Sequence, residues 1–268
     1  MHPDRSKIEI ANLAKVEEAI SSYVQQGRSI GQSVSFGLHQ MLMEGIPEDP
    51  SRPIKPGKLR TLTEHVTADG AKHLNQLIMH PASLPGAFVD LLEAADRQNL
   101  PQASPDGAAP IIEQAARLHY RFVQMHPFCD GNGRMARTLA TWLLGREDTD
   151  IFDHTVPINS VLLEHRDDYL STLAYCDELY AELTSCGLER EEALVWCEMP
   201  FVHFYGIAVI VSYREETKAI SERHRIQNET TSKNLQLLVD RRALLDFQTV
   251  KAVLPADQVI QIALGQQY

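Results

Sequence analysis

Apolar residues recur at helical spacing through most of the chain. Over 7–25 they stand three or four positions apart, which places them on one face of a helix, and the pattern repeats over 30–44. The same spacing predicts further helices over 86–97, 109–125, 132–146, 160–184 and 189–217. The chain is therefore predicted to be all-α for most of its length.

Two regions depart from the helical pattern. Four prolines within 45–57 exclude a continuing helix. In 58–66, which follow, β-branched residues alternate roughly and predict a short strand. The tail 218–268 is polar at first and apolar again from Leu235. Within it, 243–265 could form two short helices around a proline, like part of a helix-turn-helix, but the acidic charge favours a helical tail packed on the core.

Composition narrows the class of protein. The chain has 268 residues, 44% hydrophobic and 23% charged, as expected of a globular protein with one large domain or a core with small additions. A net charge of -11 argues against broad binding to nucleic acid or anionic membranes. We find no apolar run of the roughly 18 residues that cross a bilayer, and no apolar signal core at the N-terminus. Four scattered cysteines without a Cys-x-x-Cys pair are typical of the cytoplasm, where we expect the protein.

The stretch His126–Arg137, HPFCDGNGRMAR, is the part of the chain richest in chemistry. It forms a polar, glycine-rich loop between two helix patterns, and free N–H groups at a helix N-terminus make a phosphate cradle. Arg134 and Arg137 share one helix face and could hold two phosphates of one chain. Asp130 offers an oxygen ligand for Mg²⁺, and the imidazole of His126 can accept a proton near neutral pH.

Other interpretations of this stretch are weaker. Each part taken alone is more often a turn, a solvated helix face or a structural histidine. The spacing Gly131-x-Gly133-x-x-Ala136 fits the dinucleotide fingerprint, but that motif must follow a strand, whereas a helix pattern precedes it here. The Walker A pattern is absent from the sequence, and a zinc site on His126, Cys129 and Asp130 has no further ligand cluster to complete it.

The twelve residues match, position for position, the Fic family signature His-Pro-Phe-x-Asp/Glu-Gly-Asn-Gly-Arg-x-x-Arg. The segment 38–60 resembles the helix and the start of the flap that precede this motif, and Arg166-x-x-Tyr169 with Asp177 resembles the helix that follows it. The resemblance implies an all-α fold with a Fic-type helical core and a small β-hairpin flap. We expect that core over 38–208, with a helical region at 1–37 and a helical extension at 209–268.

The resemblance also implies an activity: transfer of AMP from ATP, with Mg²⁺, to a Ser, Thr or Tyr of a target protein, which could be the protein itself. Arg134 would bind phosphate and Arg137 the γ-phosphate. Tyr169 would line the nucleoside pocket or be a core aromatic. His126 would be the general base and Asp130 the Mg²⁺ ligand. The anion hole would be formed by Gly131, Asn132 and Gly133. Two alternatives to AMP transfer are transfer of another nucleotide such as UMP and a regulatory binding protein with an accessory Fic core. A homo-oligomer is compatible with each of these functions.

Family members also carry an inhibitory helix with the pattern Ser/Thr-x-x-x-Glu-Gly/Asn. Glu9 is our candidate for its glutamate, although Arg5 and Ile10 stand in the flanking places. Glu44 is one rival, with Gln40 in the Ser/Thr place and Gly45 after it. A second is Glu216, preceded by Ser212 and followed by Thr217. We expect Glu9 to compete with the γ-phosphate for Arg137.

Overall fold

A computed structural model describes residues 5–47, 54–61, 79–97, 111–146, 158–223, 251 and 255–265. Every regular element within these ranges is a helix. The chain forms two compact units, Met1–Phe152 and Asp153–Tyr268, and each is described by itself. The domain boundaries predicted after 37 and 208 are not tested by this division and stay predictions.

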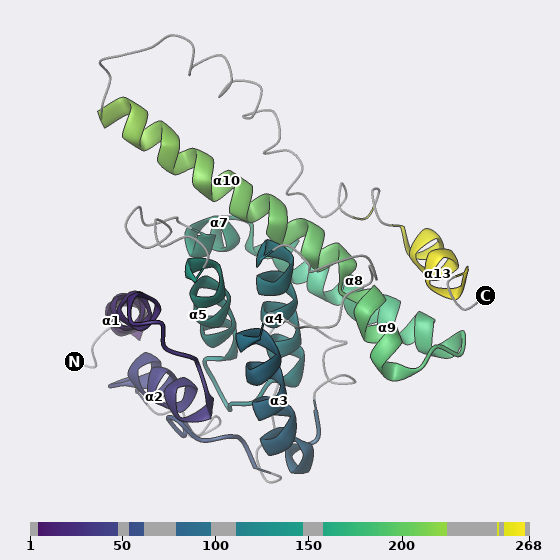
Figure 1. The fold of residues 1–268 in the computed structure, drawn as a ribbon, viewed down its shortest axis with the longest axis horizontal. Coiled ribbons are helices and arrows are strands. Elements are labelled where there is room, and N and C mark those ends of the chain that lie inside the picture. The colour runs from purple at the N-terminus through teal and green to yellow at the C-terminus, as the bar shows by residue number, and fades with distance from the viewer. Residues whose placement is uncertain are drawn as a thin grey trace. The chain divides into compact units, whose positions relative to one another are not determined.

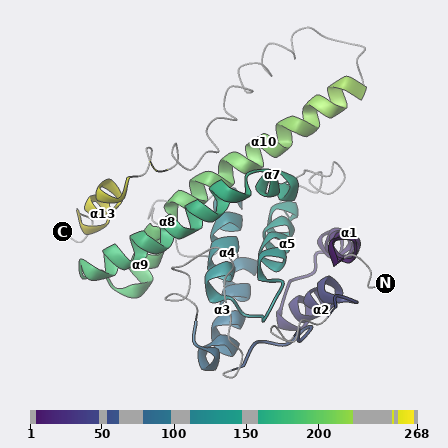
Figure 2. The same ribbon diagram turned by 180° about the vertical axis from the view of Figure 1, so that it is seen from behind.

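The first unit is built around two neighbouring helices. It contains α1 (Arg5–Gln25), α2 (Gln32–Met43), a 3-10 turn (Pro81–Ser83), α3 (Leu84–Asp96), α4 (Ile111–Met125) and α5 (Asn132–Gly145). Both views of the ribbon show α4 beside α5, and the short loop that joins them, residues 126–131, carries the sequence HPFCDG (Figures 1 and 2). Helices α1 and α2 pack against α5 and each other, and α3 packs against α4. These five helices match the predicted ones to within two residues at every end.

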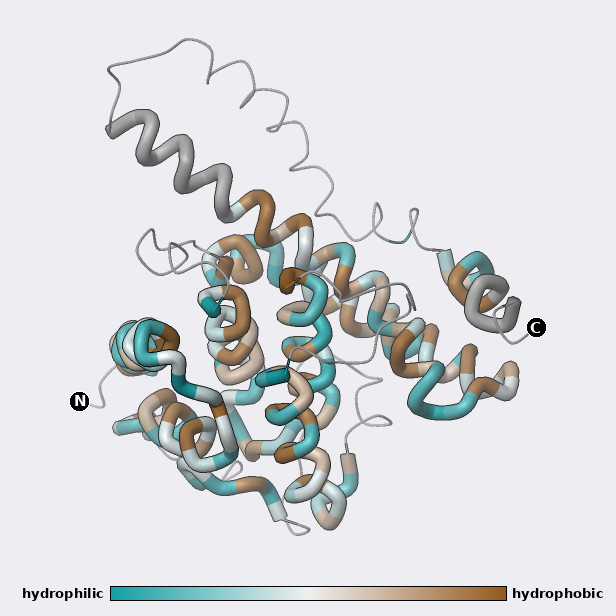
Figure 3. The backbone as a smooth tube through the Cα atoms, in the orientation of Figure 1, coloured by the Kyte–Doolittle hydropathy of each residue, from teal (hydrophilic) through white to brown (hydrophobic). Residues whose placement is uncertain are grey.

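Burial explains why the first unit holds together. Most of α4 is buried, including the fully enclosed Leu118 and Phe122, whereas α1 buries one face through Val16, Ile20 and Val24. Accordingly, the hydropathy changes back and forth along α1 in Figure 3, as expected of a helix with one solvated face. The buried Asn12 donates hydrogen bonds to the carbonyl oxygens of Leu42, at 3.2 Å, and Glu44, at 2.7 Å. Helix α1 is therefore fixed in register on the end of α2.

The second unit shows two breaks that the hydrophobic pattern did not predict. The expected helix over 160–184 is two helices, α7 (Ile158–Glu164) and α8 (Arg166–Ser185), because His165 has a ψ of 36°, outside the helical region. The expected helix over 189–217 is α9 (Arg190–Cys197) and α10 (Met199–Arg223). Pro200 explains that break, since it lacks the N–H that would continue the helix to the carbonyl of Trp196. Helix α13 (Ala256–Gly265) packs on α8 and α9.

Contrary to the prediction that no such run is present, one stretch in this unit, Arg190–Ser212, is long and apolar enough to cross a bilayer by length and composition alone, with a mean hydropathy of 1.7. Half of this stretch is buried inside the protein. The stretch is also not one continuous helix, because α9 ends and α10 begins within it. A buried core helix has the same character, so the stretch is weak support for a membrane span.

Two predictions fall largely outside the described residues. The strand expected over 58–66 is described only as far as Thr61, and 58–61 have no regular structure. The β-hairpin flap therefore stays a prediction. In the tail, the second of the two short helices corresponds to α13, whereas 243–250, where the first was expected, lie outside the described residues.

Candidate active site

The loop between α4 and α5 ends in a helix start that is open to an anion. Gly131 is the N-cap of α5, and within the described residues no side chain caps this end. Gly131 has a φ of +81°, at which a side chain would be strained, and a Cβ atom there would lie 3.0 Å from the Sδ of Met43, which would have to shift. The first-turn N–H groups of α5 thus face out of the loop with no side chain to satisfy them, as in helix ends that bind phosphate.

Asn132 closes the loop on itself. Its Oδ1 accepts a hydrogen bond from the N–H of Phe128 at 2.9 Å, and its Nδ2 donates to the carbonyl of Phe128 at 2.7 Å. The side chain is buried, and both its oxygen and its nitrogen bind the backbone of Phe128. The side chain thus shapes the loop, and the part of Asn132 in an anion hole stays a prediction that concerns its backbone N–H in the first turn of α5.

His126 begins the loop in a conformation that is unusual for a residue with a side chain, with a φ of +49°. Its Nδ1 lies 3.4 Å from the carbonyl oxygen of Val123. Because a carbonyl can only accept, Nδ1 carries the proton and Nε2 keeps its lone pair. Burial lowers the pKa of His126 to about 4, and the charge of Arg60 acts in the same direction. The imidazole is therefore neutral at pH 7, as a general base must be.

Arg60 holds the start of the loop from outside, a role that sequence reasoning missed. Its Nε donates to the carbonyl of His126 at 2.6 Å, and its backbone N–H donates to the carbonyl of Pro127 at 2.9 Å. Its guanidinium also reaches the carbonyl oxygens of Met79 and, at 3.4 Å, of Met125. The one sequence signal for Arg60 is its place in the segment that resembles the start of the flap. The neighbouring residues do not distinguish a buried arginine from an exposed one.

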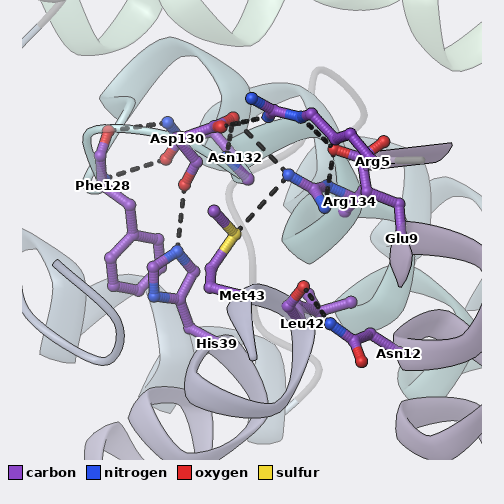
Figure 4. Close-up of polar contacts among 11 residues, drawn as sticks. Arg5, Glu9, Asn12, His39, Leu42, Met43, Phe128, Asp130, Asn132 and Arg134 are labelled. Atoms are coloured by element: carbon purple, nitrogen blue, oxygen red, sulfur yellow. Dashed lines mark hydrogen bonds and ion pairs between the residues drawn. The ribbon is translucent and has the colours of Figure 1, made fainter. Parts of the chain in front are cut away.

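Asp130, Arg134 and Glu9 meet beside this loop, together with Arg5 (Figure 4). Arg5 binds the Oδ2 of Asp130 at 2.6 Å and the Oε1 of Glu9 at 2.9 Å. Arg134 lies 3.3 Å from the same Glu9 oxygen and 3.5 Å from the Oδ1 of Asp130. The first turn of α1 therefore contacts two of the predicted site residues.

The neighbouring charges shift the pKa values of Asp130 and Arg5. Burial alone would raise the pKa of Asp130, but hydrogen bonds from Arg5 and from the N–H of Gly131 outweigh it, so the pKa lies below its usual value. The hydrogen bond to Glu9 raises the pKa of Arg5, and its contact with Asp130 adds to that rise. Asp130 is therefore an anion at neutral pH, and in this structure its partner is an arginine.

The structure describes the side chains of two of the three glutamates considered as inhibitors. Glu9 forms ion pairs with Arg5, at 2.9 Å, and with Arg134, at 3.3 Å, whereas the predicted partner is Arg137. Glu44 is exposed and pairs with Lys15 at 2.8 Å. The side chain of Glu216 lies outside the described residues.

Arg137 and Tyr169 lie in different units. Arg137, on α5, is close enough to Gly133 that a Cβ atom there would sit 3.6 Å from its Nη1. Burial lowers the pKa of the enclosed His119 to about 3, and the charge of Arg137 contributes to this. Tyr169, on α8, is buried and meets the ring of Phe201 edge-on at 5.9 Å. That contact suits a core aromatic, and its role in a nucleoside pocket stays a prediction.

The sequence pattern of the Fic/DOC family matches residues 32–144. A uridine 5'-monophosphate transferase of Xanthomonas campestris pv. campestris is 34% identical over 134 residues, 48% of this chain and 23% of its own length. A protein adenylyltransferase Fic of Nematostella vectensis is 29% identical over 155 residues, 54% of this chain and 30% of its own. The chain thus spans less than a third of either relative.

Solved structures share the fold. A Fic domain containing signaling protein of Bacteroides thetaiotaomicron matches 80% of this chain and 71% of its own with a TM-score of 0.54, at 23% identity. A Fic family protein of Desulfovibrio desulfuricans matches 90% of this chain and 65% of its own with a TM-score of 0.55, at 18% identity. Residues 32–144 of the chain are therefore a domain of the Fic/DOC family, and the solved structures show that the chain shares their fold.

Proposed function

We propose that this protein transfers AMP from ATP to a hydroxyl side chain of a protein. The observation that carries the proposal is the single loop that holds a neutral His126 at one end and the uncapped start of α5 at the other. A proton acceptor and a phosphate cradle, set a few residues apart, are what nucleotidyl transfer to a hydroxyl requires.

The chemistry follows from the contacts of His126. Its Nδ1 is held by the carbonyl of Val123, so Nε2 is the atom that accepts the proton of the attacking hydroxyl. The hydroxyl oxygen forms a bond to the α-phosphorus of ATP, the bond from that phosphorus to the bridging oxygen breaks, and pyrophosphate leaves with that oxygen. The N–H groups at the start of α5, Arg134 and Arg137 hold the phosphates during this exchange.

Asp130 fits the role of a Mg²⁺ ligand. Among the described residues, no group of three or more His, Cys, Asp and Glu side chains could hold a metal ion by itself. Mg²⁺ is often bound by one or two carboxylates together with substrate phosphates, and the ionised Asp130 supplies one carboxylate beside the cradle. When bound there, Mg²⁺ would neutralise phosphate charge.

We propose further that α1 inhibits the site. Glu9 occupies Arg134, a proposed phosphate ligand, and Arg5 occupies Asp130, the proposed metal ligand. A pair of side chains one helical turn apart thus places an anion and a cation where phosphate and Mg²⁺ would bind. ATP and Mg²⁺ would have to displace both contacts before transfer.

The two relatives differ in the nucleotide that they transfer, since one is named a protein adenylyltransferase and the other a uridine 5'-monophosphate transferase. The adenylyltransferase aligns over 54% of this chain at 29% identity and the UMP transferase over 48% at 34%, so AMP is our proposal and UMP the alternative. A proposed cytoplasmic location, where ATP is abundant, fits the same activity.

Incubation with ATP, CTP, GTP or UTP and Mg²⁺, followed by intact-mass measurement of the protein itself and of added candidate targets, tests the proposal. We expect a mass gain of one AMP that His126→Ala abolishes. His80→Ala removes an exposed histidine in the first unit and serves as the control. A gain of one UMP would assign the alternative donor, and no transfer from any nucleotide would reject the enzyme.

A further inference from the structure

His39, on α2, lies against the loop without being part of its motif. Its ring stacks on Phe128 with 3.8 Å between centroids and an interplanar angle of 7°, and only 1% of the residue is exposed. Phe128 in turn packs against the rings of Phe36, Phe88 and Phe122. The imidazole is therefore locked in place by an aromatic cluster.

The two ring nitrogens of His39 have separate partners. Nδ1 accepts a hydrogen bond from the backbone N–H of Gly57 at 2.8 Å, so Nδ1 carries no proton. Nε2 must then carry the proton, and it donates to the carbonyl oxygen of Asp130 at 2.9 Å. Figure 4 shows this contact beneath the cluster formed by Arg5, Glu9 and Arg134.

This contact sets the direction of a peptide group in the cradle. In a planar trans peptide, the C=O of one residue and the N–H of the next point in opposite directions. Because the carbonyl of Asp130 points at His39, the N–H of Gly131 points away from it. The structure agrees, since that N–H donates to the Oδ1 of Asp130 at 2.6 Å.

We infer that His39 is a positioning residue that aims the N–H of Gly131 into the phosphate cradle. A nucleotide phosphate oxygen would take the place of the carboxylate oxygen on this N–H, so the inference rests on the proposed nucleotidyl transfer. Without the bond from Nε2, the flexible Asp130–Gly131 peptide could turn its carbonyl toward the phosphates and repel them. Glycine allows such a turn more readily than any other residue.

Two conservative variants separate this role from a merely structural one. Asparagine places its amide about where Nδ1 lies and can keep the bond from Gly57, whereas glutamine, one bond longer, can keep the bond to the Asp130 carbonyl. Each variant retains one of the two hydrogen bonds, so the pair is matched for lost contacts. Thermal melting of both variants checks that they are equally folded.

The measurement is kcat and KM for AMP transfer, with pyrophosphate affinity by calorimetry as a second readout. We expect His39→Gln to keep kcat within about threefold of wild type and His39→Asn to lower it by about 10²-fold, because a donor displaced by about 1 Å costs that much. Pyrophosphate should bind about tenfold more weakly to His39→Asn than to His39→Gln. If the wild type transfers no nucleotide, the proposed function fails, and pyrophosphate binding alone decides the inference. Equal pyrophosphate affinities in the two variants, or no binding to wild type, would overturn it.

Discussion

Replacing Arg5 with alanine should lower the Mg²⁺ concentration at which transfer is half-maximal. In the structure the guanidinium of Arg5 lies 2.6 Å from the Oδ2 of Asp130, the oxygen that a metal ion would need. Arg5 and Mg²⁺ therefore compete for one carboxylate, and removing the arginine removes the competitor.

The size of the effect follows from the exposure of the pair. The side chains of Arg5 and Asp130 are 44% and 25% exposed, so solvent screens much of their attraction. Ion pairs of this kind contribute about 0.2–1 kcal/mol, which corresponds to roughly 1.4- to 5-fold in an equilibrium constant. We place the expected shift near the upper end, at about three- to fivefold, because the short, charge-assisted hydrogen bond is stronger than an average exposed pair.

The assay is the initial rate of AMP incorporation at fixed ATP over a series of free Mg²⁺ concentrations. Lys7→Ala removes the same charge from the same helical turn, and Lys7 is exposed, so it controls for the change in net charge. The midpoint should move for Arg5→Ala and stay near wild type for Lys7→Ala. Equal midpoints in the two variants would show that Arg5 does not cover the metal ligand.

Four further outcomes are expected. His126→Ala should lose about 10²–10⁴ in transfer rate while calorimetry still detects Mg·ATP binding, since the imidazole serves the hydroxyl and not the phosphates. Asp130→Ala and Arg134→Ala should each weaken Mg·ATP affinity in the same calorimetric experiment; unchanged affinity in both would place the cradle elsewhere. Glu9→Gly should raise self-modification above wild type and Glu44→Gly should not, and the reverse result would move the brake to α2. Because burial holds the pKa of His126 at about 4, the rate measured on the folded protein should be flat from about pH 8 to 5 and fall as the pH approaches 4; a midpoint near 6.5 would mean that the base is solvated.

The amino-acid sequence determined the parts of this protein that depend on near neighbours. Helices from α1 to α5 follow from apolar spacing, and the loop between α4 and α5 follows from a twelve-residue motif whose glycines and arginines act within one turn. The breaks at His165 and Glu198 were missed because apolar spacing continues through both. Pro200 was a local signal for the second break that the periodicity outweighed.

Only the tertiary structure decided which distant residues support the loop. Arg5 meets Asp130 across 125 positions of sequence, His39 meets it across 91, and Arg60 meets His126 across 66. No local pattern encodes such contacts, because a lone arginine or histidine on a helix or in a loop has many alternative partners. Packing of α1 and α2 on α5 selects among them. The chemical groups of the loop thus come from one short segment of sequence, whereas the residues that hold and cover the loop are brought to it by the fold.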